Sequence, residues 1–231
     1  MSDAPRVGII DSGVHVAHPH VGGIRGGITV TADGYAEEYT DCLGHGTAIA
    51  ALIHSLAPRA ELYAVRVFDR TLATSIDRVM RAIDWCLESE IQIINLSLGT
   101  ANPKHRNRFE TVLDRVRSAG AVLVSAFEMS GQLMLPGALL GVIGVSPDPE
   151  CAREEYRVIE RVVDGDRKKV FLAPPFPRDI PGVPREHNLN GVSFAVAHMS
   201  AHLARCRSGS AAGTGDWEYE LVGAEERHIS L

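Results

Sequence analysis

The chain has 231 residues, of which 45% are hydrophobic and 23% charged, and its 29 acidic and 23 basic side chains give a formal net charge of −6. These values are typical of one soluble globular domain with a sizeable core. A mildly acidic chain is not expected to bind nucleic acid or membrane surfaces as its main task. No apolar run approaches the roughly 18 residues of a membrane span.

The N-terminus and the cysteines bear on the compartment. A strand-like run begins already at Arg6, so we expect neither a secretory signal nor a folding prodomain ahead of it. The cysteines are widely spaced and include no CxxC pair; they are Cys42, Cys86, Cys151 and Cys206. We therefore expect a cytoplasmic protein with reduced thiols. Cys42 precedes His45 closely and is expected to be buried; if it is exposed, thiol reagents should inhibit the protein.

Predicted strands and helices alternate through the first 145 residues. A strand at 6–10 is followed by a loop rich in His, Gly and Thr, a helix at 46–54, a strand at 62–68 and an amphipathic helix at 75–88. A strand at 91–98, a helix at 107–119 and strands at 121–126 and 140–145 come next. The pattern then changes to a hairpin of 157–163 and 168–172, and to a last helix from near Ser193 to about Cys206.

This alternation predicts an α/β fold with a mainly parallel sheet that is covered on both faces. We predict one domain over residues 1–206. From Arg207 the composition changes to Ser, Gly and Ala and then to a short alternating segment, which indicates a flexible C-terminal tail over residues 207–231.

Three short segments carry the side chains that hydrolysis by a serine requires: a hydroxyl nucleophile, an imidazole base and a carboxylate that orients the imidazole. Asp11 ends the first strand, at the sheet edge where α/β sites gather. His45, in Gly-His-Gly-Thr, and Ser193, in Gly-Val-Ser-Phe-Ala, each begin a helix. Taken alone, the segments are more often a turn, a loop histidine and a capping serine. Together, and in this order, they indicate a catalytic triad.

The chain resembles the subtilase family of serine endopeptidases, whose catalytic residues follow the order Asp, His, Ser. The three triad segments carry the resemblance, and intervening segments follow the family too: Ala57–Val67, Ile94–Gly99, Leu135–Gly137, Val142–Val145 and Leu172–Pro174. The resemblance covers roughly residues 6 to 205. It implies a subtilisin-like three-layer fold with a central, mainly parallel sheet, and a peptide or protein as substrate.

The resemblance also implies where the substrate lies. An extended chain would bind beside Ser97, Leu98 and Gly99 through backbone hydrogen bonds. The primary specificity pocket would lie between that segment, the residues Ala126 and Phe127, and Met134. We predict that a methionine at the floor leaves little depth for a large aromatic side chain.

The chain departs from the family at the oxyanion site. The resemblance implies an asparagine after the strand at 121–126, and alternative alignments place Met129 or Glu128 there. Loss of such a donor typically costs about 2.7–4 kcal/mol of transition-state stabilisation. Gln132 could replace the donor, the enzyme could be slow and selective, or the fold could be a catalytically impaired pseudoprotease that binds an extended peptide. Because nucleophile and base remain, we favour a selective processing protease, such as one that removes leader peptides from biosynthetic precursors.

We expect no cofactor and no metal. The calcium loop that interrupts the histidine helix of many relatives has no counterpart, and His20 stands where a calcium-binding carboxylate often lies. His15, His18 and His20 are interpreted as loop histidines rather than a transition-metal site. An esterase of the α/β-hydrolase type is disfavoured, because that fold places its serine before the acid and the histidine.

Overall fold

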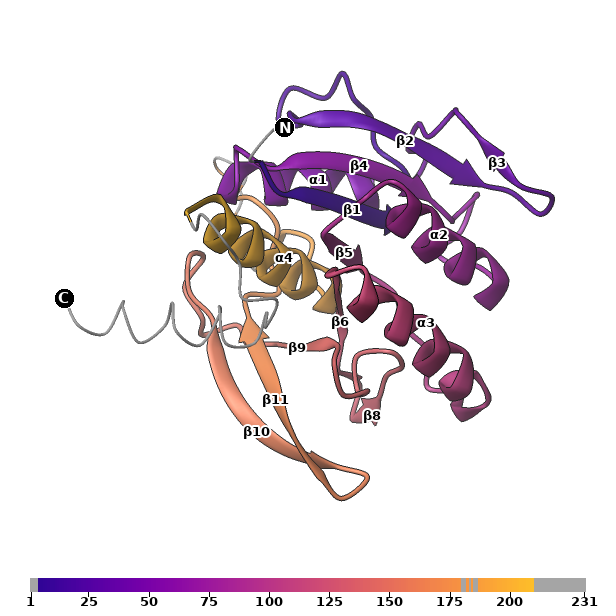
Figure 1. Ribbon diagram of the computed structural model, residues 1–231. Coiled ribbons are helices and arrows are strands. Elements are labelled where there is room, and N and C mark those ends of the chain that lie inside the picture. Colours follow the sequence, from indigo (N-terminus) through magenta and orange to yellow (C-terminus); the bar gives the residue numbers. More distant parts are fainter. Residues whose placement is uncertain (1–3, 180–181, 183, 185–186, 210–231) are drawn as a thin grey trace.

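The computed structural model describes residues 4–179, 182, 184 and 187–209 (Figure 1). Nearly all of the predicted tail, residues 210–231, lies outside this range. The described strands are β1 (Arg6–Asp11), β2 (Ile24–Val30), β3 (Tyr35–Ala36), β4 (Glu61–Arg66), β5 (Ile93–Leu96), β6 (Val122–Ala126), β7 (Glu128–Met129), β8 (Gln132–Leu133), β9 (Ile143–Pro147), β10 (Arg157–Val163) and β11 (Asp166–Ala173). The described α-helices are α1 (His45–Leu56), α2 (Ile76–Glu88), α3 (Arg106–Ser118) and α4 (Val192–Gly209).

The described strands form one nine-stranded sheet in the order β10-β11-β9-β6-β5-β1-β4-β2-β3, beside the small hairpin β7-β8. From β11 to β2 all neighbours are parallel, and only the outermost strands β10 and β3 pair antiparallel. The predicted α/β fold with a central, mainly parallel sheet is therefore confirmed.

Helices cover both faces of the sheet, which gives three layers (Figure 1). Alternate residues of β1 divide between the layers: Val7 and Ile9 pack in the core with α1 and α4, whereas Ile10 packs in the core with α2 and α3. The helices on the second face are amphipathic, as predicted. Their buried residues recur at helical spacing: Val79, Ala82, Ile83 and Cys86 of α2, and Phe109, Val112, Leu113 and Val116 of α3.

Strand β2 lies where a loop was predicted. Its sequence contains two adjacent glycines and an arginine, which weaken any strand pattern. Gly27 has a packing reason, because a Cβ atom there would lie only 2.2 Å from the carbonyl oxygen of Ala64 in the neighbouring strand β4, whereas a Cβ atom on Gly26 would meet nothing within 4 Å. The sequence pattern also missed the hairpin β7-β8. Its turn residues Ser130 and Gly131 both take positive φ angles, of 52° and 76°.

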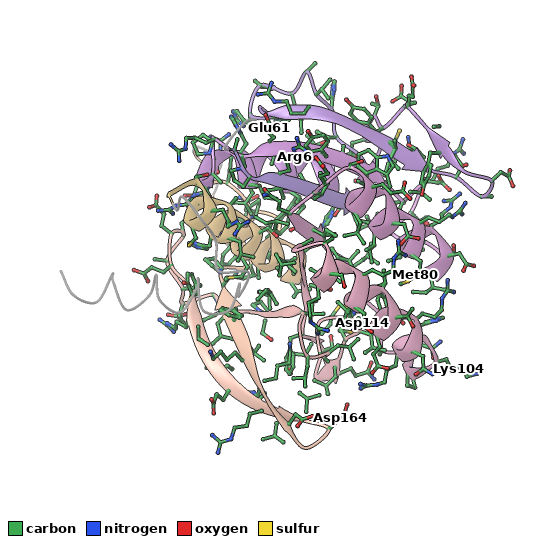
Figure 2. All side chains as sticks on the ribbon, in the orientation of Figure 1. Arg6, Glu61, Met80, Lys104, Asp114 and Asp164 are labelled. Atoms are coloured by element: carbon green, nitrogen blue, oxygen red, sulfur yellow. The ribbon has the colours of Figure 1, made fainter. Side chains whose placement is uncertain are left out.

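Strand β1 sits between β4 and β5, so the chain leaves it toward one side of the sheet and later returns to the other. A crevice forms outside the carboxyl ends of the strands at such a reversal. At the opposite end of β1, Arg6 and Glu61 form an ion pair of 3.9 Å where β1 and β4 begin (Figure 2). The carboxyl end, which carries Asp11, is thus the end at which a site is expected.

Candidate active site

The structure brings Asp11, His45 and Ser193 into one hydrogen-bonded relay. The Nδ1 atom of His45 donates to Asp11 Oδ1 at 2.8 Å, and the Ser193 hydroxyl donates to His45 Nε2 at 2.9 Å. The three residues come from the end of β1 and the first turns of α1 and α4, which pack against each other. A hydroxyl, an imidazole and a carboxylate in this order form the geometry of an activated nucleophile.

The Asp11 carboxylate is completely buried. Its Oδ1 atom also accepts a hydrogen bond of 2.7 Å from the backbone N–H of Ser12, and the Ser12 hydroxyl in turn accepts one of 2.9 Å from the Gly46 N–H. Helix α1 therefore begins in direct contact with the end of β1. A Cβ atom on Gly46 would lie 2.2 Å from the carbonyl oxygen of Gly13, so this contact requires glycine.

His45 is mostly buried, with 19% of its side chain exposed. Burial by itself disfavours the charged imidazolium, but the hydrogen bond and negative charge of Asp11, together with the charge of Asp41, outweigh it and raise the pKa of His45 above its usual value. This electrostatic setting favours an imidazolium, which is what forms when His45 takes the proton of Ser193.

Asp41 is a supporting residue that the sequence analysis missed. One of its carboxylate oxygens accepts from the backbone N–H groups of Leu43 and Gly44 at 2.8 and 2.9 Å, and the other accepts from the N–H and hydroxyl of Thr47 at 2.9 and 2.6 Å. Burial raises the pKa of Asp41, but these hydrogen bonds prevail and lower it. An aspartate shortly before a helix start is a capping signal, and here it holds the turn that presents His45.

A cleft of about 480 Å³ opens beside the relay. His45 and Ser193 line it, together with seven of the residues predicted for substrate or oxyanion binding: Ser97, Leu98, Gly99, Ala126, Glu128, Met129 and Met134. Six further residues that were not predicted also line the cleft: Phe68, Leu72, Ser130, Pro147, Gly191 and Val192. No local motif identifies Phe68 and Leu72 as cleft residues, because the loop that follows β4 reaches the cleft only in the folded protein.

Two predicted residues do not line the cleft. The Phe127 side chain is 3% exposed and packs with Ala138, Val163 and Val170, because it leaves the chain on the opposite side from Ala126. Its side chain is therefore not part of the described lining of this cleft. Gln132 pairs with Met129 across the β7-β8 hairpin and is also absent from the lining, so its proposed role as a substitute donor finds no support.

Gly99 and Met134 lie side by side in the lining of the cleft. A Cβ atom on Gly99 would lie 3.4 and 3.5 Å from the Cβ and Cε atoms of Met134, so the methionine packs directly against this segment. The neighbouring Ser97 hydroxyl accepts a hydrogen bond of 2.7 Å from the side-chain amide of buried Asn95. The segment expected to pair with a substrate is thus held from behind.

The described lining of this cleft contains no side-chain amide, so the amide donor of the family has no counterpart there. Glu128 and Met129 occupy the expected region, and both are exposed. A carboxylate repels a developing oxyanion, and a thioether provides no N–H. Among the described residues, the backbone N–H groups at the start of α4 are the donors nearest in the chain to the nucleophile.

The described residues contain no group of three or more His, Cys, Asp or Glu side chains arranged to hold a metal ion. None of the described helices is long and apolar enough to cross a membrane.

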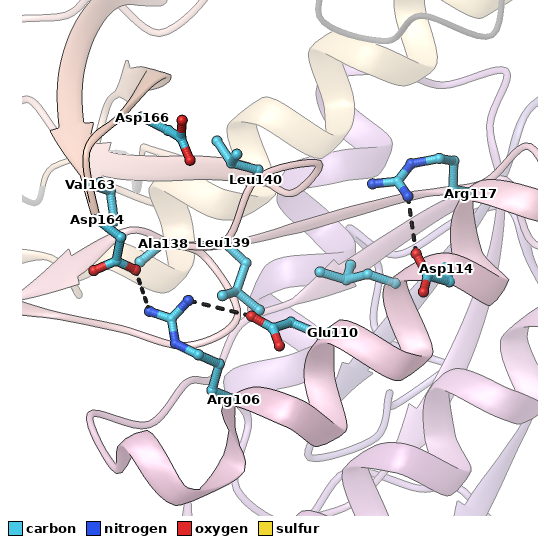
Figure 3. Close-up of a pocket in the computed structure, with 11 residues that line it drawn as sticks. Arg106, Glu110, Asp114, Arg117, Ala138, Leu139, Leu140, Val163, Asp164 and Asp166 are labelled. Carbon is cyan, nitrogen blue, oxygen red and sulfur yellow. Dashed lines mark hydrogen bonds and ion pairs between the residues drawn. The ribbon is translucent and has the colours of Figure 1, made fainter.

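A separate hollow of about 280 Å³ is lined by α3 and the β10-β11 turn (Figure 3). Charged side chains in its lining pair with one another: Arg106 with Glu110 and Asp164, and Arg117 with Asp114. Both arginines of this hollow are therefore already paired with carboxylates of the same chain.

Cys42 is exposed rather than buried as predicted, because it lies with Leu43 and Gly44 in an exposed stretch before α1. Cys86 is buried between α2 and β1, and burial raises the pKa of its thiol far above the usual range. The structure places none of the four cysteines in a disulfide.

A three-layer α/β fold with an aspartate, a histidine and a serine in one relay beside a cleft has the architecture of a serine hydrolase site. A family model described as Subtilase family matches residues 2–131, and the chain belongs to this family. The resemblance identified from the motifs is therefore confirmed.

Three individual relatives are similar to the chain in sequence. The chain is 32% identical over 215 residues to a thermostable alkaline protease of Halalkalibacterium halodurans, covering 88% of this chain and 56% of the relative. It is 33% identical over 130 residues to subtilisin E of Bacillus subtilis, covering 52% and 33%, and 29% identical over 215 residues to subtilisin DY of Bacillus licheniformis, covering 86% and 75%. The chain thus spans only a third to just over half the length of the first two relatives.

Proposed function

We propose that the protein is a serine endopeptidase that uses Asp11, His45 and Ser193 as its catalytic triad. The observation that carries the proposal is the relay itself, with both hydrogen bonds already at 2.8 and 2.9 Å. In the reaction, Ser193 Oγ attacks the carbonyl carbon of the scissile bond while His45 Nε2 takes its proton. His45 then passes that proton to the leaving amine, and Asp11 stabilises the imidazolium between the two steps. Water repeats the sequence on the acyl-enzyme.

The chemistry is slower than in relatives that have the oxyanion amide. Removal of one such donor typically lowers kcat by about 10²–10³-fold. The Ser193 backbone N–H, at the positive end of α4, remains as a donor to the oxyanion. A slow enzyme suits the processing of a few dedicated peptides, including leader-peptide removal from a biosynthetic precursor. The free thiols, with Cys42 exposed, fit a reducing compartment such as the cytoplasm.

The lining of the cleft supports a peptide as substrate. Leu98, Met134 and Phe68 give it apolar walls, and the Ser97–Gly99 segment lines it. An extended chain can therefore add backbone hydrogen bonds there while its side chains enter the cleft.

A fluorophosphonate probe tests the proposal, because it reacts only with an activated serine hydroxyl. We expect labelling of Ser193 in the wild type and none in Ser193→Ala, with a strong reduction in His45→Ala. Equal melting temperatures of the three proteins ensure that folding is not the cause. If the wild type is fully folded but is not labelled, the proposal fails. The alternative is then a peptide-binding pseudoprotease, which the lack of a side-chain amide in the described lining of the cleft favours.

A further inference from the structure

A second hollow, of about 440 Å³, lies next to the segments that present the reacting side chains. Gly44, one position before His45, lines it, as do Asn188 and Leu189, which precede Ser193 closely. It shares no lining residue with the cleft, which is lined by His45 and by Gly191 to Ser193. The two linings are thus neighbours in the chain at the starts of both α1 and α4, and we name the second one the leaving-side hollow.

The polar lining of the leaving-side hollow consists mainly of groups that donate hydrogen bonds. Arg178 contributes a guanidinium, and His15, His18 and His20 contribute imidazoles. The Nδ1 atom of His18 accepts a hydrogen bond of 3.3 Å from the His20 backbone N–H, so the Nε2 atom carries the proton of its neutral ring and is a donor. Guanidinium and imidazole N–H groups are the usual partners of carboxylates.

Asp41 is the one carboxylate among the described residues that line this hollow. One of its oxygens accepts hydrogen bonds from the backbone N–H groups of Leu43 and Gly44 just before α1, and the other accepts two from Thr47 in the first turn of α1. The positive end of the α1 dipole further offsets its charge. Asp41 therefore does not occupy the donors of Arg178 or the histidines.

The loop that carries the three histidines is anchored to α1 through His15. The backbone N–H of His15 donates to the Thr47 hydroxyl at 3.1 Å, which ties the 15–20 loop to the same turn that Asp41 caps. On the other wall, the Asn188 side-chain amide donates to the backbone carbonyl of Arg178 at 2.9 Å. This bond uses only the backbone of Arg178, so it survives a change of the side chain.

The cleft differs from the hollow in its charged groups. Glu128 is the only carboxylate among its described lining residues, and no lysine or arginine is present among them. A guanidinium is therefore present in the lining of the leaving-side hollow but not in that of the cleft.

We propose that the leaving-side hollow binds a carboxylate on the part of the substrate that follows the scissile bond. This inference rests on the proposed endopeptidase function. The carboxylate belongs either to an acidic side chain or to the C-terminus of a short leaving peptide. Arg178 provides the ion pair, the histidines add hydrogen bonds, and Leu189 and Pro177 give the apolar contacts.

Acyl transfer to an added amine tests binding in the leaving-side hollow directly. An ester substrate first forms the acyl-enzyme, and the amine then competes with water for the acyl group. The amine nitrogen forms the new C–N bond and gives up a proton to His45, which passes a proton to Ser193 Oγ as the bond to that oxygen breaks. Three nucleophiles separate the sources of charge: Ala-Glu amide, Ala-Gln amide, and Ala-Gln with a free C-terminal carboxylate. The matched variants are Arg178→Gln and His20→Gln, with Arg167→Gln on the exposed β10-β11 hairpin as control.

We expect the wild type to prefer at least one carboxylate nucleophile over Ala-Gln amide by roughly two- to fivefold, the range of a solvent-exposed ion pair. Arg178→Gln should remove the preference, His20→Gln should reduce it, and Arg167→Gln should keep it. Equal use of all three nucleophiles by a wild type whose Ser193 reacts with the fluorophosphonate overturns this inference alone. A preference that persists in Arg178→Gln also overturns it. A wild type that the probe does not label overturns the proposed function together with this inference.

Discussion

Replacement of Gly46 by alanine should damage the relay through a single methyl group. The new Cβ would lie 2.2 Å from the Gly13 carbonyl oxygen, whereas ordinary contacts begin at 3.4 Å, so α1 must retreat by about 1.2 Å (3.4 − 2.2). The obstacle is backbone, and the Val14 N–H directly after it donates a hydrogen bond of 3.0 Å to the Tyr39 carbonyl oxygen. The loop therefore has little room to yield, and His45 moves with the helix.

A displacement of about 1 Å at a reacting group costs about 10²-fold in rate. Overpacking of this kind costs about 1–3 kcal/mol of stability, and for a chain of this length each kcal/mol lowers Tm by about 2–4 °C. We therefore expect Gly46→Ala to label with fluorophosphonate about a hundredfold more slowly and to melt a few degrees lower.

Gly26→Ala is the matched control, because a Cβ atom there meets nothing within 4 Å. It should react and melt nearly as the wild type does. If Gly46→Ala labels Ser193 at the wild-type rate, helix α1 tolerates the shift and the argument from close contact is refuted.

Three further predictions concern charge and exposure. Asp41→Asn removes a charge that raises the pKa of His45, so the acidic limb of the pH–rate profile should move to lower pH; an unmoved limb would contradict the assignment. The pKa of Asp41 in the folded protein lies below its unfolded value of 3.8. The ionised carboxylate therefore stabilises the folded protein above pH 3.8, and this stabilisation is lost as the pH falls through the folded pKa. Measurements of Tm at decreasing pH should show the loss in the wild type but not in Asp41→Asn. Alkylation of the native protein should modify Cys42 long before Cys86, and Cys42→Ser should remove any inhibition that follows; mass spectrometry of digests distinguishes the sites.

The sequence predicted those parts of the protein that depend on local pattern. The buried strands and the amphipathic helices show their own periodicity, and the triad follows from three motifs at element boundaries. Strand β2 carries no such pattern, because glycine at position 27 is required by close contact with Ala64, on a strand that comes more than thirty positions later. Only the assembled sheet explains why glycine stands there.

The substrate cleft illustrates the same limit at the level of single side chains. Ala126 and Phe127 are neighbours in the chain, yet only the first lines the cleft. The direction of each side chain depends on where β6 ends and the β7-β8 hairpin begins, and that hairpin was not predicted. Asp41 was missed for another reason: its role is visible only once its oxygens are seen to accept from the turn that carries His45.

The packing of α4 against α1 has a consequence for biosynthesis. His45 and Ser193 are separated by 148 positions, and the hydroxyl lies on α4, which follows every other described strand and helix in the chain. A growing chain that already holds β1 and α1 has its imidazole but no nucleophile beside it. The hydrogen-bonded relay can therefore form only after α4 has been synthesised.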